Sequence, residues 1–243
     1  MYAVVLLTTI IGISWLYNNL QSLYFIPTQH QAKSKYDYWL NGHHGRYYPV
    51  KNAEKLIFMC HGNAGDVSNR TYLAEEFNRL GVSCYLYDYP GTGRNNGNNT
   101  HYEIIRTATD VYKHFSNIYP NIILYGESIG CLIATKLASI HPIQKIILQS
   151  GPSSISDMIN HILFKPLGFL ESEFNSIDNI RLFSTDQQAI VMHSKNDEIV
   201  PYEQGIRVAK ALQQRGNLHR FYRIKGSHNN SVIPWNKINE FIK

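Results

Sequence analysis

Residues 121–140, NIILYGESIGCLIATKLASI, join an apolar run, a glycine-flanked turn and a second apolar stretch. Asn121–Tyr125 is rich in β-branched and aromatic residues and predicts a buried strand, whereas Ile129–Ile140 has the length and pattern of a helix. Between them lies Gly126-Glu-Ser-Ile-Gly130, a Gly-x-Ser-x-Gly pattern that arises by chance in about one in twelve chains of this size. Its place between a strand and a helix predicts a sharp turn that exposes Ser128.

Ser128 has the setting of a nucleophile on a strained turn. A strand that turns at once into a helix forces unusual backbone angles on this residue, and a Cβ at Gly126 or Gly130 would collide across the turn. The N-terminus of the following helix supplies N–H groups and a favourable dipole for an oxyanion, and we expect the N–H of Ile129 to be one donor. The alternative is an ordinary serine between two glycines, which the strand–turn–helix context disfavours.

On both sides of this turn, short apolar runs alternate with amphipathic stretches, which predicts βαβ units. The predicted strands are Lys55–Cys60, Ser83–Asp88, Asn121–Tyr125, Lys145–Gln149, Ala189–His193 and His219–Ile224. The predicted helices are about Arg70–Leu80, Tyr102–Ile118, Ile129–Ile140, Tyr202–Arg215 and Val232–Ile242. This alternation indicates an α/β fold with a mostly parallel sheet and helices on both faces.

Two segments depart from the alternation. Tyr36–Val50 predicts an antiparallel hairpin at the edge of the sheet, with its turn at Asn41-Gly42. Residues 151–185 carry their own apolar set and predict a compact helical insertion between two strands. Within the insertion, Met158, Ile162 and Phe164 are candidates to line an apolar pocket, although packing onto the sheet explains each of them equally well.

The loops at the ends of the predicted strands carry the chemistry, because ligands of open parallel sheets bind beyond the carboxyl ends of the strands. His61-Gly-Asn-Ala-Gly65 follows Lys55–Cys60, and its small residues let backbone N–H groups point into a site. We expect the N–H of Asn63 to be the second oxyanion donor. His61 precedes Ser128 in the chain and lies in this loop, so we interpret it as structural.

An acid and a base follow Ser128 in the chain. Asp197 lies in the loop after the predicted strand Ala189–His193, with Glu198 as the fallback acid, and His228 follows the last predicted strand. The order Ser128, Asp197, His228 is that of a nucleophile, an acid and a base on one sheet edge. In such a triad the histidine takes the serine proton, the aspartate fixes the imidazole, and water later releases the acyl group as an acid. The triad needs no metal and no organic cofactor, and none is predicted.

The motifs HGNAG, YDYPGTG, GESIG, HSKNDEIVP and GSHNN occur in this order along the chain. With them, the chain from about Tyr36 onward resembles an α/β-hydrolase. It is most similar to the small membrane-anchored serine hydrolases that include the bud-emergence-type proteins and the protein depalmitoylases. The resemblance implies the α/β-hydrolase fold with a short helical cap at about residues 151–185, and an enzyme that cleaves carboxylic or thio-esters of apolar acyl groups. The alternatives are a serine peptidase or amidase on the same fold, and a catalytically silent hydrolase fold used for binding.

Two features depart from the pattern of that group. Its members usually carry Ser two residues after the last Gly of the YPGxG motif, where this chain has Asn95. The depalmitoylases carry an N-terminal cysteine cluster for their own lipidation, whereas this chain has no Cys before Cys60. A depalmitoylase assignment is therefore weakened, and membrane attachment must depend on the N-terminal apolar run.

The N-terminal run Tyr2–Tyr17 carries no charge, and the first Lys or Arg of the chain is Lys33. The run is slightly shorter than the roughly 17 to 20 residues that a spanning helix needs. We predict a hydrophobic anchor at residues 1–27 that attaches the hydrolase domain, residues 28–243, to a membrane. A cleaved signal peptide and a buried first helix are the alternatives. Lys33 and Lys35 follow the run and favour a cytoplasmic domain.

The composition is that of one folded domain, with 243 residues of which 44% are hydrophobic and 17% charged. The net charge of +5 comes from scattered Lys and Arg without a nucleic-acid-binding module, so no nucleic acid partner is predicted. This charge indicates a mildly basic solvated surface or, alternatively, weak attraction to anionic lipid headgroups. Cys60, Cys84 and Cys131 lack the number and spacing of a disulfide framework or zinc site, and they predict buried free thiols in a reducing compartment. Nothing in the sequence indicates the oligomeric state.

Overall fold

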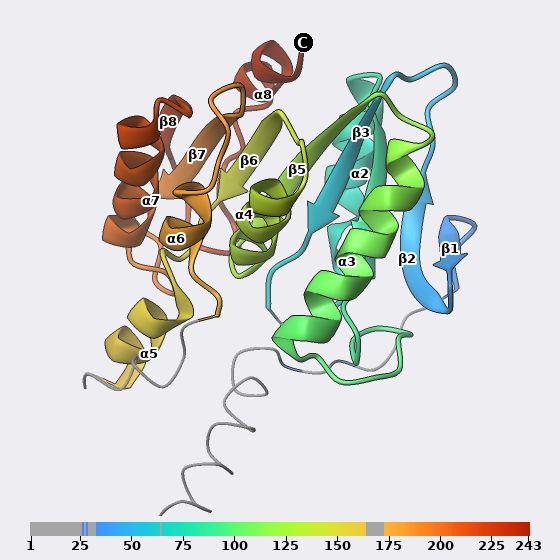
Figure 1. Cartoon of the computed structure of the whole chain (residues 1–243), viewed down its shortest axis with the longest axis horizontal. Coiled ribbons are helices and arrows are strands. Elements are labelled where there is room, and N and C mark those ends of the chain that lie inside the picture. The colour runs from blue at the N-terminus through green and yellow to red at the C-terminus, as the bar shows by residue number, and fades with distance from the viewer. Residues whose placement is uncertain (1–25, 27, 29–32, 64, 164–172) are drawn as a thin grey trace, which may run out of the picture.

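The computed structural model describes residues 26, 28, 33–63, 65–163 and 173–243 of the chain. Within them, eight strands form one sheet in the order β1-β2-β4-β3-β5-β6-β7-β8 (Figure 1). The strands are β1 (Asp37–Leu40), β2 (His43–Tyr48), β3 (Lys55–Cys60), β4 (Ser83–Tyr87), β5 (Asn121–Glu127), β6 (Lys145–Gln149), β7 (Gln188–Ser194) and β8 (Leu218–Ile224). The helices are the 3₁₀ turn η1 (Val67–Arg70), α2 (Thr71–Arg79), α3 (His101–Ser116), α4 (Gly130–Ile140), α5 (Ile155–Leu163), α6 (Ser176–Ile180), α7 (Tyr202–Arg215) and α8 (Trp235–Ile242).

The sheet is parallel from β4 to β8, and the hairpin β1–β2 adds two antiparallel strands at one edge. In the hairpin turn, Asn41 and Gly42 have φ angles of 50° and 82°. Two successive left-handed residues are what a two-residue hairpin turn needs, because their twist matches that of the strands. The predicted mostly parallel sheet and its antiparallel edge hairpin are confirmed.

Helices cover both faces of the sheet because apolar residues occupy both sides of each central strand. In β3, Leu56, Phe58 and Cys60 face the layer that contains α3, α4 and α7. Ile57 and Met59 face the opposite layer, which contains α2 and α8. Figure 1 shows α3 and α4 in front of the sheet and α2 behind it. The prediction of helices on both faces is confirmed.

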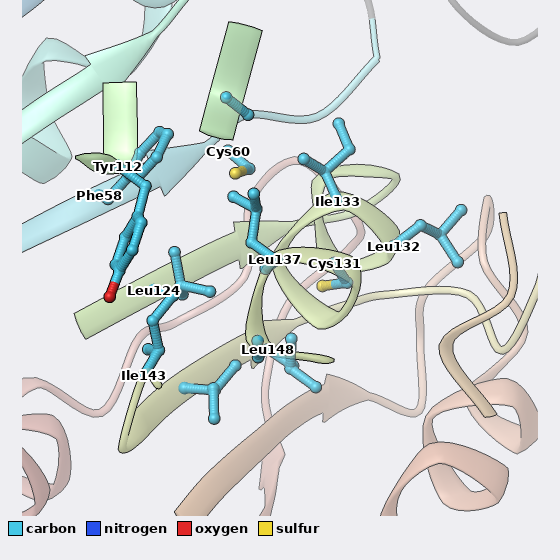
Figure 2. Packing of buried hydrophobic residues seen from close by; sticks show 14 of the residues in the cluster. Phe58, Cys60, Tyr112, Leu124, Cys131, Leu132, Ile133, Leu137, Ile143 and Leu148 are labelled. Carbon is cyan, nitrogen blue, oxygen red and sulfur yellow. The ribbon is translucent and has the colours of Figure 1, made fainter. Parts of the chain in front are cut away.

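The helix α4 lies against the middle of the sheet. Figure 2 shows its Leu137 among Cys60, Leu124 and Leu148, which come from β3, β5 and β6 and belong to the same buried cluster. Burial of one such aliphatic side chain stabilises a fold by about 2 kcal/mol. The helix that follows Ser128 is therefore anchored on the sheet by its buried face.

The starts of α2 and α8 differ from those that the sequence pattern predicts. The chain makes the 3₁₀ turn η1, whose N-cap is Asp66, before α2 begins at Thr71 rather than at Arg70. The last helix begins at Trp235 rather than at Val232. A residue that precedes proline avoids the helical region, so Ile233 cannot belong to the helix and Pro234 becomes its N-cap.

The insertion after β6 is helical where the structure describes it. It contains α5 and α6, and an isolated bridge between Ser154 and Asn175 joins the residues that directly precede these two helices. Figure 1 shows α5 beyond the carboxyl ends of β6 and β7. Residues 164–172, which include the pocket candidate Phe164, lie outside the described residues. The predicted helical insertion is thus confirmed for its described parts.

No helix in the described ranges combines the length and the apolar character that a membrane crossing requires. The predicted anchor at residues 1–27 lies outside the described residues, apart from Ile26.

All three cysteines are free and buried, as predicted. Cys60 ends β3, Cys84 lies in β4, and Cys131 lies in the first turn of α4. Burial raises the pKa of each of these thiols. They therefore stay protonated and weakly reactive in the folded protein.

Candidate active site

Ser128 lies on the turn between β5 and α4 with a backbone φ of 53°. A left-handed φ is strained for a residue with a side chain, and the turn is held by the hydrogen bond that Ser128 N–H donates to the Gln149 carbonyl of β6 at 2.8 Å. A Cβ on Gly126 would lie 2.6 Å from the Cα of Cys131, and one on Gly130 would overlap the carbonyl group of Cys60 at the end of β3. The predicted strained turn and its need for two glycines are confirmed.

His228 and Asp197 meet Ser128 at this edge of the sheet. His228 Nε2 lies 3.0 Å from Ser128 Oγ, and His228 Nδ1 lies 2.8 Å from both carboxylate oxygens of Asp197. When Nδ1–H donates to the carboxylate, Nε2 becomes the acceptor for the serine hydroxyl. Ser128 is 8% exposed, while the Asp197 side chain is fully buried. The hydrogen-bonded chain therefore leads from a buried carboxylate to a serine that a substrate can reach.

The backbone of the loop after β7 also holds Asp197. Its Oδ1 accepts the N–H groups of Ile199 at 3.1 Å and Val200 at 2.8 Å. Burial alone would raise the pKa of this carboxyl group, but hydrogen bonds from His193, His228 and Val200 hold it well below its usual range. The carboxylate is therefore an anion at neutral pH.

Glu198 and His61, the two other candidates from the sequence, do not belong to this hydrogen-bonded chain of side chains. Glu198, the fallback acid, accepts the backbone N–H of His228 at 3.0 Å, so it fixes the loop that carries the base. His61 is buried, its Nδ1 lies 2.7 Å from the Gly62 carbonyl, and its ring stacks on Tyr89 with centroids 4.2 Å apart. These contacts agree with the interpretation of His61 as a structural residue.

The two predicted oxyanion donors flank the serine. Ile129 is the N-cap residue of α4, and the first N–H groups of a helix lack partners within it. Asn63 lines the same pocket as Ser128, and its side-chain Oδ1 accepts the N–H of Ile26 at 2.9 Å. Ile26 therefore contacts the loop that holds one of the candidate donors.

An ion pair beside Ser128 escaped the sequence analysis. The Arg70 Nε donates to Glu127 Oε2 at 2.9 Å, and the N–H of Gly62 donates to the same oxygen at 3.2 Å. The carboxylate thus joins the turn that carries Ser128, the loop after β3 and the start of α2. Glu127 occupies a variable position of the Gly-x-Ser-x-Gly pattern, and no spacing relates it to an arginine 57 residues away.

The pocket at Ser128 has a volume of about 230 Å³. Its lining residues are Gly62, Asn63, Arg70, Glu127, Ser128, Ile199, His228 and Asn229. Most of these residues are polar or charged, and Ile199 is the one large apolar residue among them. Among the described residues, no group of three or more His, Cys, Asp or Glu side chains could hold a metal ion.

The described residues of the insertion do not line the pocket at Ser128. Ile162 is 63% exposed, and the Met158 sulfur accepts a hydrogen bond from the Gln204 amide at 3.2 Å. A second pocket of about 590 Å³ lies between α5, the acid loop and α7, and its lining is mostly charged or polar. The expectation that Met158 and Ile162 line an acyl pocket therefore stays a prediction.

Asn95, the departure from the resembled group, is buried within a polar network. Its Nδ2 donates to the carbonyls of His44 at 3.1 Å and Asp88 at 2.9 Å, and its Oδ1 accepts the N–H of His44. A serine hydroxyl has a single donor and cannot make all three bonds. The asparagine therefore joins the loop after β4 to the hairpin β1–β2 more extensively than a serine would.

Comparison with known families agrees with this geometry. The model of the family described as serine aminopeptidase, S33 (Hydrolase_4) matches residues 51–177, which include Ser128 and both flanking glycines. The chain belongs to this family. It is thus a member of the α/β-hydrolase superfamily, and the α/β-hydrolase fold expected from the sequence is confirmed.

Individual relatives of this hydrolase extend the comparison. The uncharacterized protein R595 of Acanthamoeba polyphaga mimivirus is 31% identical, over 76% of this chain and 71% of that protein. The human alpha/beta hydrolase domain-containing protein 17B is 26% identical, over 67% of this chain and 57% of its own length. The chain therefore spans about 57% to 71% of these two relatives.

Two solved structures share the fold. The Pyrococcus furiosus esterase Pf2001 superposes with a TM-score of 0.68 at 16% identity, covering 82% of this chain and 84% of that one. Est1E from Butyrivibrio proteoclasticus, solved with bound ferulic acid, superposes with a TM-score of 0.66 at 20% identity, covering 84% of this chain and 94% of that one. At these identities the likeness concerns the fold.

Proposed function

We propose that this hydrolase cleaves carboxylic esters or thioesters of apolar acyl groups through an acyl-enzyme on Ser128. The observation that carries the proposal is the continuous chain of hydrogen bonds from Ser128 Oγ through the His228 ring to the Asp197 carboxylate. A separation of 3.0 Å between the nucleophile and the base is within reach for proton transfer.

The reaction follows from these partners. His228 Nε2 takes the Ser128 proton while Oγ attacks the acyl carbon, and the imidazolium then protonates the leaving alcohol or thiol. Asp197 holds the Nδ1–H tautomer and stabilises the charged ring. A water molecule then attacks the acyl-enzyme with the help of the same base, and the carboxylic acid leaves.

We assign the oxyanion donors to the backbone N–H groups of Asn63 and Ile129. One donor of this kind typically contributes about 3 kcal/mol to transition-state stabilisation when it is held in place beforehand. The ion pair between Arg70 and Glu127, with its bond from Gly62, fixes the loop of one donor against the turn of the other. This arrangement supports an oxyanion hole that does not reorganise during the reaction.

Two observations support an ester over a peptide substrate. The solved structures with the same fold include a protein named as an esterase. An aminopeptidase must also bind the free ammonium group of its substrate, and a buried ammonium needs an acidic partner. Among the residues that line the pocket at Ser128, the carboxylate of Glu127 is already paired with Arg70.

A serine peptidase is the second candidate, because the description of the matching family names a serine aminopeptidase. It would use the same triad, so the two candidates differ in the leaving group and in the recognition of the acyl part. A catalytically silent fold used for binding is the third.

A fluorophosphonate probe, which reacts with activated serines, separates an enzyme from a silent fold. We expect the probe to label the wild-type protein and to leave Ser128→Ala unlabelled. Ser150→Ala is a matched control, because Ser150 also has a left-handed φ (50°) and is buried at the end of β6. The control should label like the wild type, and a folded wild type without labelling would overturn the proposal.

A substrate panel then separates esters from peptides. It consists of p-nitrophenyl esters and thioesters of increasing acyl length and of aminoacyl anilides, each assayed with wild type and Ser128→Ala. We expect turnover of the esters that is lost in Ser128→Ala. Turnover of the anilides alone would establish the peptidase instead.

We also propose that residues 1–27 attach the domain to a membrane with the domain on the cytoplasmic side. The uncharged run Tyr2–Tyr17, followed by Lys33 and Lys35, supports this proposal. A protein without residues 1–27 should leave the membrane fraction of cells that express it. If the shortened protein stays bound, the attachment lies elsewhere in the chain.

A further inference from the structure

Asp197 has a second histidine neighbour, which the triad itself does not require. His193 lies near the end of β7 and is fully buried. Its Nε2 lies 3.3 Å from Asp197 Oδ2 and 3.0 Å from the Val200 carbonyl. The same Oδ2 lies 2.8 Å from His228 Nδ1. One carboxylate oxygen is thus placed between two imidazole rings.

The surroundings of His193 determine which of its nitrogens carries the proton. Its Nδ1 is buried and has no hydrogen-bond partner among the described residues. Its Nε2 faces two acceptors, the Val200 carbonyl and Asp197. Since a neutral imidazole has one N–H, the proton belongs on Nε2, where it has acceptors. His193 is therefore a donor to the acid loop.

The ring of His193 is packed against α7. Tyr202 contacts it edge to face, with ring centroids 5.9 Å apart. Gly205 lies within α7, where glycine costs about 1 kcal/mol relative to alanine, yet a Cβ at this position would overlap His193 Nδ1. The unfavourable glycine in α7 therefore lies where the helix contacts the His193 ring.

Space filling alone does not explain this histidine. An apolar side chain such as leucine would fill this space without burying a ring nitrogen that lacks a partner, and such a nitrogen costs free energy. This free-energy cost is offset only if the hydrogen bond that Nε2–H donates stabilises the fold or assists the reaction. The group that it faces is the acid of the triad.

We propose that His193 is a positioning residue for the hydrolytic site, and that its Nε2–H orients the Asp197 carboxylate toward His228 and draws negative charge away from it. This inference depends on the proposed function of the triad. It goes beyond that function, since it adds a residue that touches neither the substrate nor the nucleophile.

The proposal has a consequence for the pH dependence of the reaction. The charged groups that face His228 are Asp197 and Glu198 from the acid loop and Arg70 and Glu127 across the pocket. When His193 stops donating, Asp197 holds more negative charge and attracts the protonated form of His228 more strongly. His228 then keeps its proton to higher pH, and the acid limb of kcat/KM moves upward in pH.

The test compares His193→Phe with His193→Gln, which fills less space but retains a side-chain N–H near the position of Nε2. We expect His193→Phe to lower kcat about tenfold, the factor that corresponds to one ordinary hydrogen bond, and to move the acid limb upward. His193→Gln should recover most of both effects. A role in packing alone predicts that both variants lower kcat and that neither moves the acid limb, because Phe is too large for the space and Gln too small.

Gly205→Ala provides a second, independent variant if His193→Phe folds poorly. The added Cβ pushes on Nδ1 and displaces the ring without changing its chemistry. The acid limb should move in the same direction as in His193→Phe. If the acid limb stays at its wild-type position in every folded variant, His193 has no positioning role.

A measurement without substrate keeps this test separate from the proposed function. The Cε1 proton of His228, assigned by its loss in His228→Gln, is followed by NMR as the pH is changed in the wild type and in both His193 variants. The titration should move upward in His193→Phe and return in His193→Gln. An unmoved titration overturns the inference, whereas a wild type that lacks ester turnover overturns only the proposed function.

Discussion

Two clusters of histidine and aspartate lie at the carboxyl ends of the parallel strands. They differ in the residue type that stands at the centre. In the active-site cluster, one aspartate, Asp197, lies between two histidines. In the second, the hairpin cluster, one histidine lies between two aspartates: the nitrogens of His44 lie 3.2 Å from Asp37 and 3.0 Å from Asp88. The residue types are the same, but the central residue is exchanged.

The exchange decides what each cluster can do. A histidine acts as a general base only when one ring nitrogen is left to face a nucleophile. His228 meets this condition, because Nδ1 binds Asp197 and Nε2 faces Ser128. Both nitrogens of His44 face carboxylates, and its ring is fully buried. A pair of His and Asp is therefore weak evidence for catalysis until the second nitrogen has been accounted for.

The hairpin cluster joins parts of the scaffold instead. Asp88 Oδ1 accepts the N–H of Val67 at 3.0 Å, and the Asp88 carbonyl accepts the Asn95 amide at 2.9 Å. His44 belongs to β2, so the cluster connects the hairpin β1–β2 with the loops after β3 and β4. Its buried polar groups should therefore affect stability, whereas those of the active-site cluster should affect rate.

Asp→Asn in each cluster is the test with the largest expected effect. In Asp197→Asn the amide no longer holds His228 in the tautomer that accepts the serine proton, so kcat for an ester should fall about 10⁴-fold. In Asp88→Asn, kcat per folded molecule should stay within about threefold of the wild type. Both rates are measured by steady-state kinetics, with the folded fraction taken from circular dichroism. A small loss in Asp197→Asn would remove Asp197 from the triad.

Asp88→Asn should instead lower the free energy of unfolding by about 3 kcal/mol, because it breaks a buried charged network and leaves polar partners unpaired. Urea unfolding at neutral pH measures the change. The matched control is Asp178→Asn, whose side chain is 54% exposed and pairs with Arg181 at the surface. Exposed pairs contribute little, so the control should change the free energy of unfolding by less than about 1 kcal/mol. Equal losses in the two variants would contradict the role given to the hairpin cluster.

Asn95→Ser should have the smallest effect. The serine can replace only part of the three bonds of the amide, so we expect a loss of about 1 to 2 kcal/mol in the free energy of unfolding and an unchanged kcat. Asn96→Ser, at the exposed neighbouring position, is the control and should leave both quantities unchanged. A fall in kcat with stability preserved would show that the loop after β4 takes part in the reaction.

The scaffold of the site could be predicted because its signals are local. The strands β3 and β6 have their predicted bounds, since each is an apolar run that begins at a lysine. The turn at Ser128 could be predicted from two glycines and the change from strand to helix. The order of the triad along the chain then indicated which acid and base to expect at later strand ends, and the structure brings those side chains together.

The polar pairs that support the site could not be predicted in this way. Arg70 and Glu127 lie 57 residues apart, and His44 and Asp88 lie 44 apart. Arginine and glutamate most often lie on solvated surfaces, so residue type alone does not reveal a partner. His193 precedes Asp197 by four positions, but only the course of the loop after β7 places its ring against the carboxylate. The missed residues are thus those whose roles depend on tertiary contacts.

The three buried cysteines allow local unfolding of the protein to be measured without a substitution. A thiol reagent can reach Cys60 only when the layer of α3, α4 and α7 opens, and Cys84 only when the layer of α2 and α8 opens. It can reach Cys131 only when the first turn of α4 lifts from the sheet. Alkylation rates in the native protein, followed by mass spectrometry for each cysteine, would therefore measure local opening at three separate places in the core. The Cys131 rate would measure how readily the turn that holds Ser128 loosens, with no cysteine introduced into the chain.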